Sequence, residues 1–300
     1  MAEDKHFRGL HTALVTPFND QQEIDREAYK KHLRYQIEGG VNGLVISGTT
    51  GESPTLSDEE FTYLIETAVE EAGDDCVVIA GSGANDTRKS VKKSILAEEV
   101  GADGLLIVAP YYNKPVQRGI KKHYTEIADA VDIPLIVYNV PGRTSINIEP
   151  DTIAELAAHP NIVAVKEASG DIGQVMDIIS KVPDDFSVLS GDDSMTLPLI
   201  AGGGDGLISV ASNEAPELMK QYVWHCLNDE MVSAREFHYK LLPLMNANFW
   251  ESNPIPVKAA LAMMGRMKNI LRAPMVPLDI EYEENLMNIL EKLELVKAEV

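Results

Sequence analysis

The sequence predicts a (β/α)8 barrel followed by a C-terminal helical subdomain, and three observations support this prediction. Eight short apolar runs recur along the first two thirds of the chain, with starts 19 to 33 residues apart. Helical patterns lie between them, as parallel strands with helical crossovers require. Eight strands favour a closed barrel over an open sheet, which would usually carry G-x-G-x-x-G in its first turn.

The eight runs are short and rich in β-branched residues, as expected for strands of a parallel sheet covered on both faces. Helix signals stand between them, such as the capping box SDEE at residues 57–60 and glycine or proline stops. The clearest predicted helices cover residues 25–38, 85–100 and 152–158. The predicted strands lie in HTALVTP from His11, GLVISG from Gly43, CVVIAGSG from Cys76, GLLIVAP from Gly104, PLIVYNVP from Pro134, IVAVKEAS from Ile162, SVLSGDD from Ser187 and GLISVAS from Gly206.

The pattern changes near residue 225. From there helical periodicity continues to the C-terminus, interrupted by the proline-containing segments NPIPVK and APMVPL. We therefore predict a (β/α)8 barrel over residues 1–225, which would carry the catalytic site. Residues 226–300 would form an appended helical subdomain.

The charge balance excludes several classes of partner. Lys and Arg number 26 and Asp and Glu 47, which gives a formal net charge of −21. Nucleic acids and anionic membranes both need a basic face, so we expect neither as a partner. The two cysteines offer no disulfide framework, and the first residues lack the apolar segment of a signal peptide. No apolar run approaches the roughly 18 residues of a membrane span, so we expect a cytoplasmic protein.

Lys166 stands at the C-terminal end of the sixth predicted strand, after the apolar run of NIVAV. An exposed strand end whose lysine reaches water would explain it, since most lysines are solvated. In a barrel, however, the C-terminal strand ends face the active-site mouth. We therefore take Lys166 as a candidate catalytic residue.

Polar residues close several other predicted strands at the same end of the barrel. The segment GTTGE is either a tight turn or a cradle in which the N–H groups of Thr49 and Thr50 bind a carboxylate. Tyr138 is either a rim aromatic or a proton carrier beside the lysine. Arg143 is either a surface charge or a residue whose guanidinium binds a substrate carboxylate.

A lysine is a nucleophile only when it is neutral. An unperturbed lysine, with a pKa of about 10.4, is neutral in roughly one molecule in a thousand near neutral pH. Lowering this pKa to about 7–8 disfavours the cation by roughly 3–5 kcal/mol, and an apolar barrel mouth with a nearby arginine acts in that direction. The residues therefore permit a Schiff-base lysine and carbonyl chemistry on a small oxo-acid.

Metal and serine chemistry find less support. The seven histidines show neither H-E-x-x-H nor H-x-H spacing, and G-x-S-x-G does not occur. The SGDD segment could bind a divalent ion, but adjacent aspartates are more often loop or cap residues. We expect no metal.

Seven segments, in the right order and spacing from His11 to about Leu261, resemble one known family. They are GTTGES, PYYNKP, YNVPGRT, VKEASGD, SGDD, GGDGLISV and NPIPVKAAL. Together they are similar to the dihydrodipicolinate synthase / N-acetylneuraminate lyase family of pyruvate-dependent class I aldolases. The resemblance implies a homotetramer or homodimer, and a reaction that uses a covalent imine with pyruvate and no cofactor.

The resemblance also implies roles for individual residues. Lys166 would form the Schiff base with C2 of pyruvate, because carbanion chemistry at C3 needs the protonated imine as an electron sink. Tyr138 would donate and accept protons. Thr49 and Tyr112 would complete the proton relay, with Tyr112 reaching into the neighbouring subunit's site. The substrate-binding residues would be Thr50, chiefly through its backbone N–H, with Ile208, Arg143 and Gly191.

Arg143 decides which second substrate the resemblance favours. In carrying an arginine after the Y-N-x-P turn, the sequence resembles those family members in which this arginine binds the carboxylate of L-aspartate 4-semialdehyde. Sialic-acid and sugar-acid lyases usually lack this arginine. The resemblance therefore implies condensation of pyruvate with this semialdehyde to 4-hydroxy-tetrahydrodipicolinate, on the route to diaminopimelate and lysine. The alternatives are a lyase of the same family acting on N-acetylneuraminate or a 2-keto-3-deoxy sugar acid, and a non-catalytic barrel that only binds.

One region departs from the family pattern. Lysine-inhibited members carry a histidine or another aromatic residue shortly after the GTTGES turn and a glutamate on the following helix. The corresponding positions here hold Asp58, Phe61 and Lys89. Lys89 would repel an ammonium group that a glutamate would attract. We therefore expect inhibition by L-lysine to be weak or absent.

Overall fold

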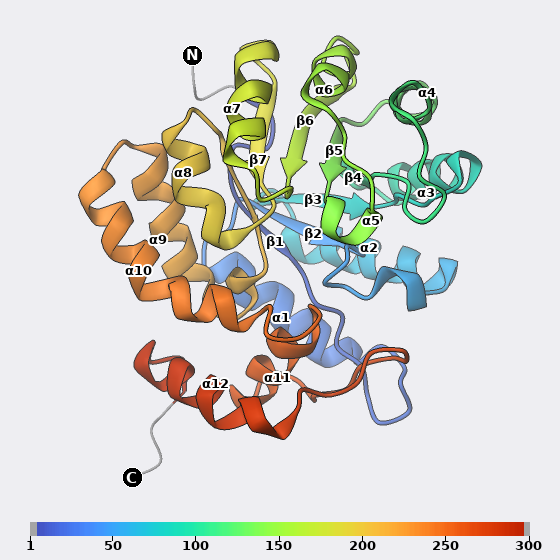
Figure 1. Ribbon diagram of the computed structural model, residues 1–300. Coiled ribbons are helices and arrows are strands. Elements are labelled where there is room, and N and C mark those ends of the chain that lie inside the picture. The colour runs from blue at the N-terminus through green and yellow to red at the C-terminus, as the bar shows by residue number, and fades with distance from the viewer. Residues whose placement is uncertain (1–4, 297–300) are drawn as a thin grey trace.

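A closed parallel barrel forms the centre of the molecule, which confirms the predicted fold class (Figure 1). The structure is a computed structural model and describes residues 5–296. The strands are hydrogen-bonded in sequence order, and β8 pairs with β1 to close the barrel, with Leu207 opposite Leu10. The strands are β1 Gly9–Ala13, β2 Gly43–Ile46, β3 Val77–Gly81, β4 Gly104–Val108, β5 Leu135–Asn139, β6 Ile162–Glu167, β7 Ser187–Ser190 and β8 Gly206–Ser209.

Helices cover the outside of the barrel, and α1, α2, α3, α7 and α12 each begin at a residue whose side chain caps the helix. Asp25 accepts a hydrogen bond from the N–H of Ala28 at the start of α1, and Ser57 and Glu60 form the predicted capping box of α2. The three helices predicted with bounds agree with the structure within two residues at each end. The helices are α1 Arg26–Glu38, α2 Asp58–Ala72, α3 Thr87–Glu99, α4 Gln117–Ala128, α5 Pro141–Thr144, α6 Pro150–Leu156, α7 Ile172–Lys181, α8 Thr196–Ala201, α9 Pro216–Leu227, α10 Met231–Ala247, α11 Ile255–Met263 and α12 Ile280–Lys292, with short 3₁₀ helices η1 Ser53–Thr55, η2 Asp193–Met195 and η3 Ala211–Asn213.

Apolar cores lie on both sides of the barrel wall. The inner core includes Val45, Ile79, Leu106, Ile136 and Leu189, each from a different strand. A larger core fills the space between the strands and the surrounding helices. Because successive strand residues point to opposite faces, a continuous apolar run supplies both cores at once.

The C-terminal helices lie across one end of the barrel. In Figure 1, α11 and α12 lie beyond the end to which the arrowheads of β5 and β6 point. The predicted division between residues 225 and 226 falls inside α9, which packs against β1 and β8 as the last barrel helix. The outermost residues of the two predicted parts, 1–4 and 297–300, lie outside the described residues. The division into barrel and subdomain stays a prediction.

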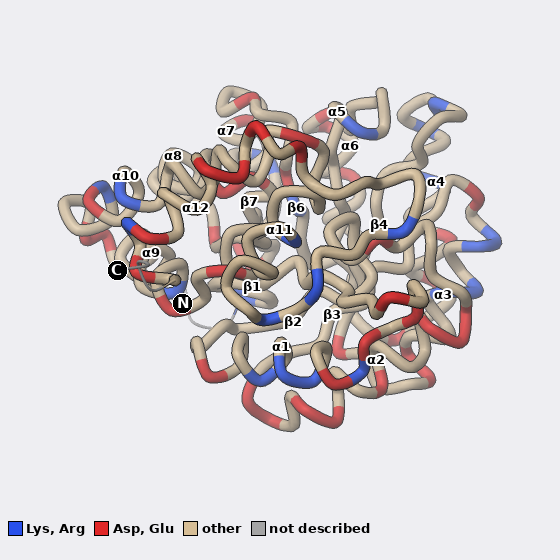
Figure 2. The backbone as a smooth tube through the Cα atoms, turned by 90° about the horizontal axis from the view of Figure 1, so that it is seen from below, with Lys and Arg blue, Asp and Glu red and all other residues tan. Residues whose placement is uncertain are grey.

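Acidic residues are spread over the outer helices and loops, in keeping with the net charge of −21 (Figure 2). Over residues 5–296, no helix is long and apolar enough to cross a membrane. Cys76 and Cys226 are both buried and free. Burial raises the pKa of each thiol to about 11, so both are protonated near neutral pH.

Candidate active site

A cavity of about 730 Å³ opens at the C-terminal ends of the strands. Each of the eight strands, or a residue shortly after it, contributes to the cavity wall. This is where a parallel barrel gathers polar groups from distant parts of the chain. Six of the eight predicted site residues line the cavity: Thr49, Thr50, Tyr138, Arg143, Lys166 and Gly191.

Lys166 lies near the end of β6, and its side chain lines the cavity with only 5% of its surface exposed. The ammonium nitrogen lies 4.3 Å from the centre of the Tyr138 ring. Burial lowers the pKa of Lys166 to about 8, and Arg143 acts in the same direction, while Asp193 and Asp192 oppose the shift. Roughly one molecule in five therefore carries a neutral amine near pH 7.4, as a nucleophile requires.

Tyr138 stands beside Lys166 because the two residues are register partners on the adjacent strands β5 and β6. Burial raises the pKa of Tyr138, while the charge of Arg143 and a hydrogen bond with the Thr49 side chain act against the shift. The phenol is therefore protonated near neutral pH. It can donate this proton to a group that reacts at Lys166 and take it back.

Gly191 leaves room for the lysine. It follows β7, and a Cβ atom built on it would lie 3.0 Å from Cε and 3.1 Å from Cγ of Lys166, and 2.8 Å from Cβ of Ala168. Any side chain at this position would press on the aliphatic part of Lys166. Because Gly191 has no side chain, its backbone can lie close to Lys166 at the cavity wall.

The turn after β2 presents Thr49 and Thr50 to the cavity. Among the hydrogen bonds of the described residues, none uses the backbone N–H of Thr49 or Thr50. These donors are therefore available to a carboxylate, which favours the cradle over a plain tight turn. The Thr50 hydroxyl accepts a hydrogen bond from Nδ2 of Asn253 at 2.9 Å.

Arg143 lies in the short helix α5 that follows β5, at the outer part of the cavity. Its Nη2 donates to the backbone carbonyl of Asn253 at 3.3 Å, and the residue is otherwise exposed. A guanidinium in this position can bind a carboxylate that enters the cavity.

Two of the predicted site residues do not line the cavity. Tyr112 is 88% exposed, has a left-handed φ of 73° and is not among the residues that line the chain's own cavity. Ile208 is 1% exposed and packs in the inner barrel core next to the site. The role of Tyr112 in a neighbouring subunit and the contact of Ile208 with pyruvate stay predictions.

Two polar residues near the site were not predicted from the sequence. Asn253 lines the cavity, and its Oδ1 is buried without a hydrogen-bond partner in the described structure. Asp193 is buried behind the cavity, where it accepts hydrogen bonds from Ser209 Oγ and the N–H groups of Val210 and Ala211. Asn253 lies in NPIPVK, where the sequence suggested no role for it, and Asp193 lies in SGDD, whose aspartates the sequence indicated only as loop or cap residues.

The SGDD aspartates cap and brace local structure. Asp192 accepts from the N–H and the hydroxyl of Ser194 at the start of η2. Over the described part of the chain, no group of three or more His, Cys, Asp or Glu side chains could hold a metal ion.

A lysine-rich wall forms the outer part of the cavity between α2 and α3. Asp58 pairs with Lys92 at 2.7 Å, and Lys89 and Lys93 also line the cavity. Phe61 is fully buried, so its side chain lies in the core and not in the cleft, contrary to the expectation from the sequence. The apolar ring packs there because α2 turns this face towards the barrel.

Comparison with known proteins agrees with the geometry of the site. The model of the dihydrodipicolinate synthetase family matches residues 6–293. A relative named 4-hydroxy-tetrahydrodipicolinate synthase, from Koribacter versatilis, is 50% identical over 286 residues, which are 94% of each chain.

Solved structures show the same fold. Dihydrodipicolinate synthase from Thermotoga maritima superposes with a TM-score of 0.95 at 46% identity, covering 97% of this chain and 99% of that one. The chloride-inhibited enzyme from Acinetobacter baumannii, complexed with pyruvate, has a TM-score of 0.95 at 40% identity and covers 97% and 100%. From these matches over nearly its whole length, the chain belongs to the dihydrodipicolinate synthetase family.

Proposed function

We propose that this protein is a 4-hydroxy-tetrahydrodipicolinate synthase, a lyase that condenses pyruvate with L-aspartate 4-semialdehyde. The observation that carries the proposal is the buried Lys166, with a pKa lowered to about 8, beside the Tyr138 phenol in a cavity with free backbone donors. The shared name of relatives that match nearly the whole chain supports the choice of reaction. The product leads to diaminopimelate and lysine, and the enzyme would act in the cytoplasm.

The first half of the reaction uses the neutral amine of Lys166. It attacks C2 of pyruvate, and the C2 oxygen leaves as water after it receives protons, which Tyr138 would carry. The resulting protonated imine withdraws electrons, so a proton can leave C3 and give an enamine. No cofactor is needed, because the imine itself accepts the electron pair.

The second half joins the two substrates. The enamine carbon attacks the aldehyde carbon of the semialdehyde, and the new alkoxide takes up a proton. The amino group of the semialdehyde then attacks C2 of the imine, closes the ring and expels Lys166 as a free amine. One pyruvate and one semialdehyde thus give one 4-hydroxy-tetrahydrodipicolinate and one water.

The substrate carboxylates would be bound at two places. The N–H groups of Thr49 and Thr50 would hold the carboxylate of pyruvate, with Ile208 and Gly191 packed against the same substrate. Arg143, further out in the cavity, would bind the carboxylate of the semialdehyde.

The site would be completed by a second copy of the chain. Tyr112 is 88% exposed and outside the chain's own cavity, as expected of a residue that would contact a neighbouring chain. We therefore propose a homodimer or homotetramer. Light scattering on the purified protein should give two or four chains, and Tyr112→Phe should lower kcat; a fully active monomer would contradict this arrangement.

The imine is tested by reduction. Borohydride added with pyruvate should attach one three-carbon unit to the peptide that contains VKEASG, and Lys166→Arg should abolish the adduct. An unmodified peptide in the wild-type protein would rule out the imine mechanism. Only that result would favour the alternative of a non-catalytic barrel that binds its ligand without reaction.

The second substrate is tested by competition between reactions. Arg143→Ala should weaken use of the semialdehyde by about tenfold or more and leave imine formation with pyruvate within about twofold, since one charge-assisted carboxylate contact is lost. Faster cleavage of N-acetylneuraminate or a 2-keto-3-deoxy sugar acid than condensation of the semialdehyde would favour a lyase instead.

A further inference from the structure

The turn that carries Thr49 and Thr50 has an unfavourable backbone conformation. Ser47 and Glu52, on either side of the two threonines, both have left-handed φ values, 58° and 56°. Non-glycine residues rarely adopt this conformation, and it persists only where surrounding contacts hold it. The contacts of the turn therefore determine where the carboxylate cradle lies.

Glu52 anchors the turn through a buried ion pair with Lys258 of α11 and a hydrogen bond from the segment between α11 and α12. Its Oε1 accepts a hydrogen bond from Nζ of Lys258, in α11, at 2.7 Å, and its Oε2 accepts from the backbone N–H of Arg272 at 3.0 Å. The two side chains of the ion pair are 2% and 0% exposed. Burial lowers the pKa of Lys258, and the charge of Glu52 opposes this shift.

Lys258 also reaches the turn by a second route. Its Nζ donates to the backbone carbonyl of Thr16 at 2.9 Å, and the Thr16 hydroxyl donates to the carbonyl of Gly51 at 2.8 Å. The turn is thus held at two neighbouring residues, Gly51 by its backbone and Glu52 by its side chain.

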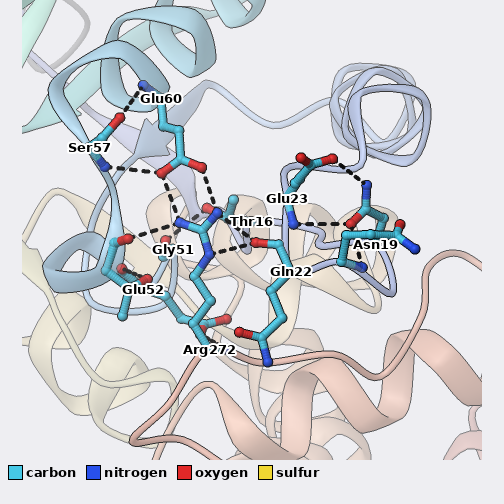
Figure 3. A network of polar contacts seen from close by, with 11 residues as sticks. Thr16, Asn19, Gln22, Glu23, Gly51, Glu52, Ser57, Glu60 and Arg272 are labelled. Carbon is cyan, nitrogen blue, oxygen red and sulfur yellow. Dashed lines mark hydrogen bonds and ion pairs between the residues drawn. The ribbon is translucent and has the colours of Figure 1, made fainter.

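Arg272 fixes the segment that follows the turn, as Figure 3 shows. Its Nη1 donates to the carbonyl of Thr55 at 2.8 Å, and its guanidinium binds both oxygens of Glu60 at 2.8 and 2.5 Å. The same guanidinium donates to the carbonyl of Gln22 at 2.7 Å. This bidentate arrangement fixes orientation as well as distance.

We propose that Glu52, Lys258 and Arg272 are positioning residues, through which the C-terminal segment sets the place of the Thr49–Thr50 cradle relative to Lys166. These hydrogen bonds, one of them an ion pair, come from residues more than 200 positions away in the chain, and they act on a turn that cannot keep its backbone conformation alone. The inference rests on the proposed function, because the cradle is where pyruvate would bind.

The expected effect is on pyruvate more than on the semialdehyde. Binding groups displaced by about 1 Å can lower a rate on the order of a hundredfold. Arg143 is linked to the turn only through Asn253, whose carbonyl accepts from Arg143 and whose side chain donates to the Thr50 hydroxyl, so the binding of the semialdehyde should change less than that of pyruvate. A merely structural role would lower the amount of active enzyme and leave both half-saturating concentrations unchanged.

The test is a double variant, Glu52→Gln with Lys258→Met, which removes both buried charges together and leaves no orphaned ion. Its matched control is Glu155→Gln with Lys121→Met, the same two changes in an ion pair whose side chains are 59% and 48% exposed. For each protein we would measure borohydride trapping against pyruvate concentration, steady-state KM for both substrates, and thermal unfolding.

The double variant should raise the half-saturating pyruvate concentration by about tenfold or more, with the KM of the semialdehyde within about threefold. The control should match the wild type. A pyruvate half-saturation within twofold of wild type would overturn the positioning inference alone, while a wild-type protein without a trapped adduct would overturn the proposed function as well.

A second variant covers the case in which the double variant does not fold. Thr16→Val removes only the hydroxyl that holds the carbonyl of Gly51. It should raise the half-saturating pyruvate concentration by about threefold, with a smaller change in the semialdehyde KM. Equal values for wild type and Thr16→Val would count against the inference.

Discussion

Two buried lysines show how different surroundings give one residue type two uses. Lys166, at the end of β6, is 5% exposed, borders the cavity, and makes no hydrogen bond or ion pair with the described residues. Lys258, in α11, is 0% exposed and is bound by the Glu52 carboxylate and the Thr16 carbonyl. Burial lowers the pKa of both.

The difference lies in what replaces the lost water. A carboxylate at 2.7 Å stabilises the Lys258 cation, so this lysine is suited to hold structure. The face of the Tyr138 ring is a weaker partner for Lys166, so that the neutral amine becomes accessible near neutral pH. A buried lysine is therefore a candidate nucleophile when it borders a cavity and lacks a bonded carboxylate.

The largest effect should come from Lys166→Met. Without the amine no imine forms, so kcat/KM should fall by about a thousandfold or more, which is over 4 kcal/mol of transition-state stabilisation. A steady-state assay measures this loss. Activity within tenfold of wild type would show that Lys166 is not the nucleophile.

The same variant should be more stable than the wild type at pH 7. The pKa of Lys166 is lowered from 10.5 to about 8 in the folded protein, so between these two pH values the unfolded chain binds a proton that the folded protein does not bind. The resulting penalty is absent above pH 10.5, grows as the pH falls to 8 and is constant below, reaching about 3 kcal/mol. Urea unfolding at pH 7 and pH 10 should show a gain that shrinks at the higher pH.

Lys258→Met should have the opposite effect on stability. It leaves the Glu52 carboxylate buried and unpaired, which costs about 3–5 kcal/mol. Lys121→Met, in the exposed pair with Glu155, should cost less than about 1 kcal/mol. Chemical denaturation measures the free energy of unfolding of each variant. Equal losses in the two variants would mean that the burial of an ion pair does not determine how much it stabilises the protein.

The rate of imine formation should depend on pH through the titration of Lys166. The reactive form is the neutral amine, so the rate should rise with pH, reach half its plateau near pH 8 and level off about one pH unit higher; at pH 7 it should be about tenfold below the plateau. Stopped borohydride trapping at fixed pyruvate measures the profile. A rate that is flat from pH 6 to 9 would contradict the lowered pKa.

The smallest effect concerns the exposed lysines of α3. Lys89 lines the outer cavity and Lys92 already occupies Asp58, so an incoming L-lysine would meet repulsion and no free carboxylate among these residues. Millimolar L-lysine should therefore change the rate by less than about twofold. Strong inhibition would show that Asp58 exchanges Lys92 for the ligand.

Local sequence patterns predicted the strands, the capping box of α2 and Lys166 as the candidate nucleophile. β-branched runs and the capping box at Ser57 act within a few residues, so they can be read without knowing the fold. The barrel rule then placed Lys166, Tyr138 and Thr49 at one rim, because parallel strands end on the same side.

Only the tertiary structure decided which distant residues hold this rim in place. Glu52 and Lys258 lie 206 positions apart, and neither residue type nor spacing announces their pairing. Phe61 shows the same limit, since the direction of a side chain depends on what packs around its element. Periodicity reports which face of an element is buried, whereas ion pairs across the molecule depend on the relative placement of elements, which no local pattern encodes.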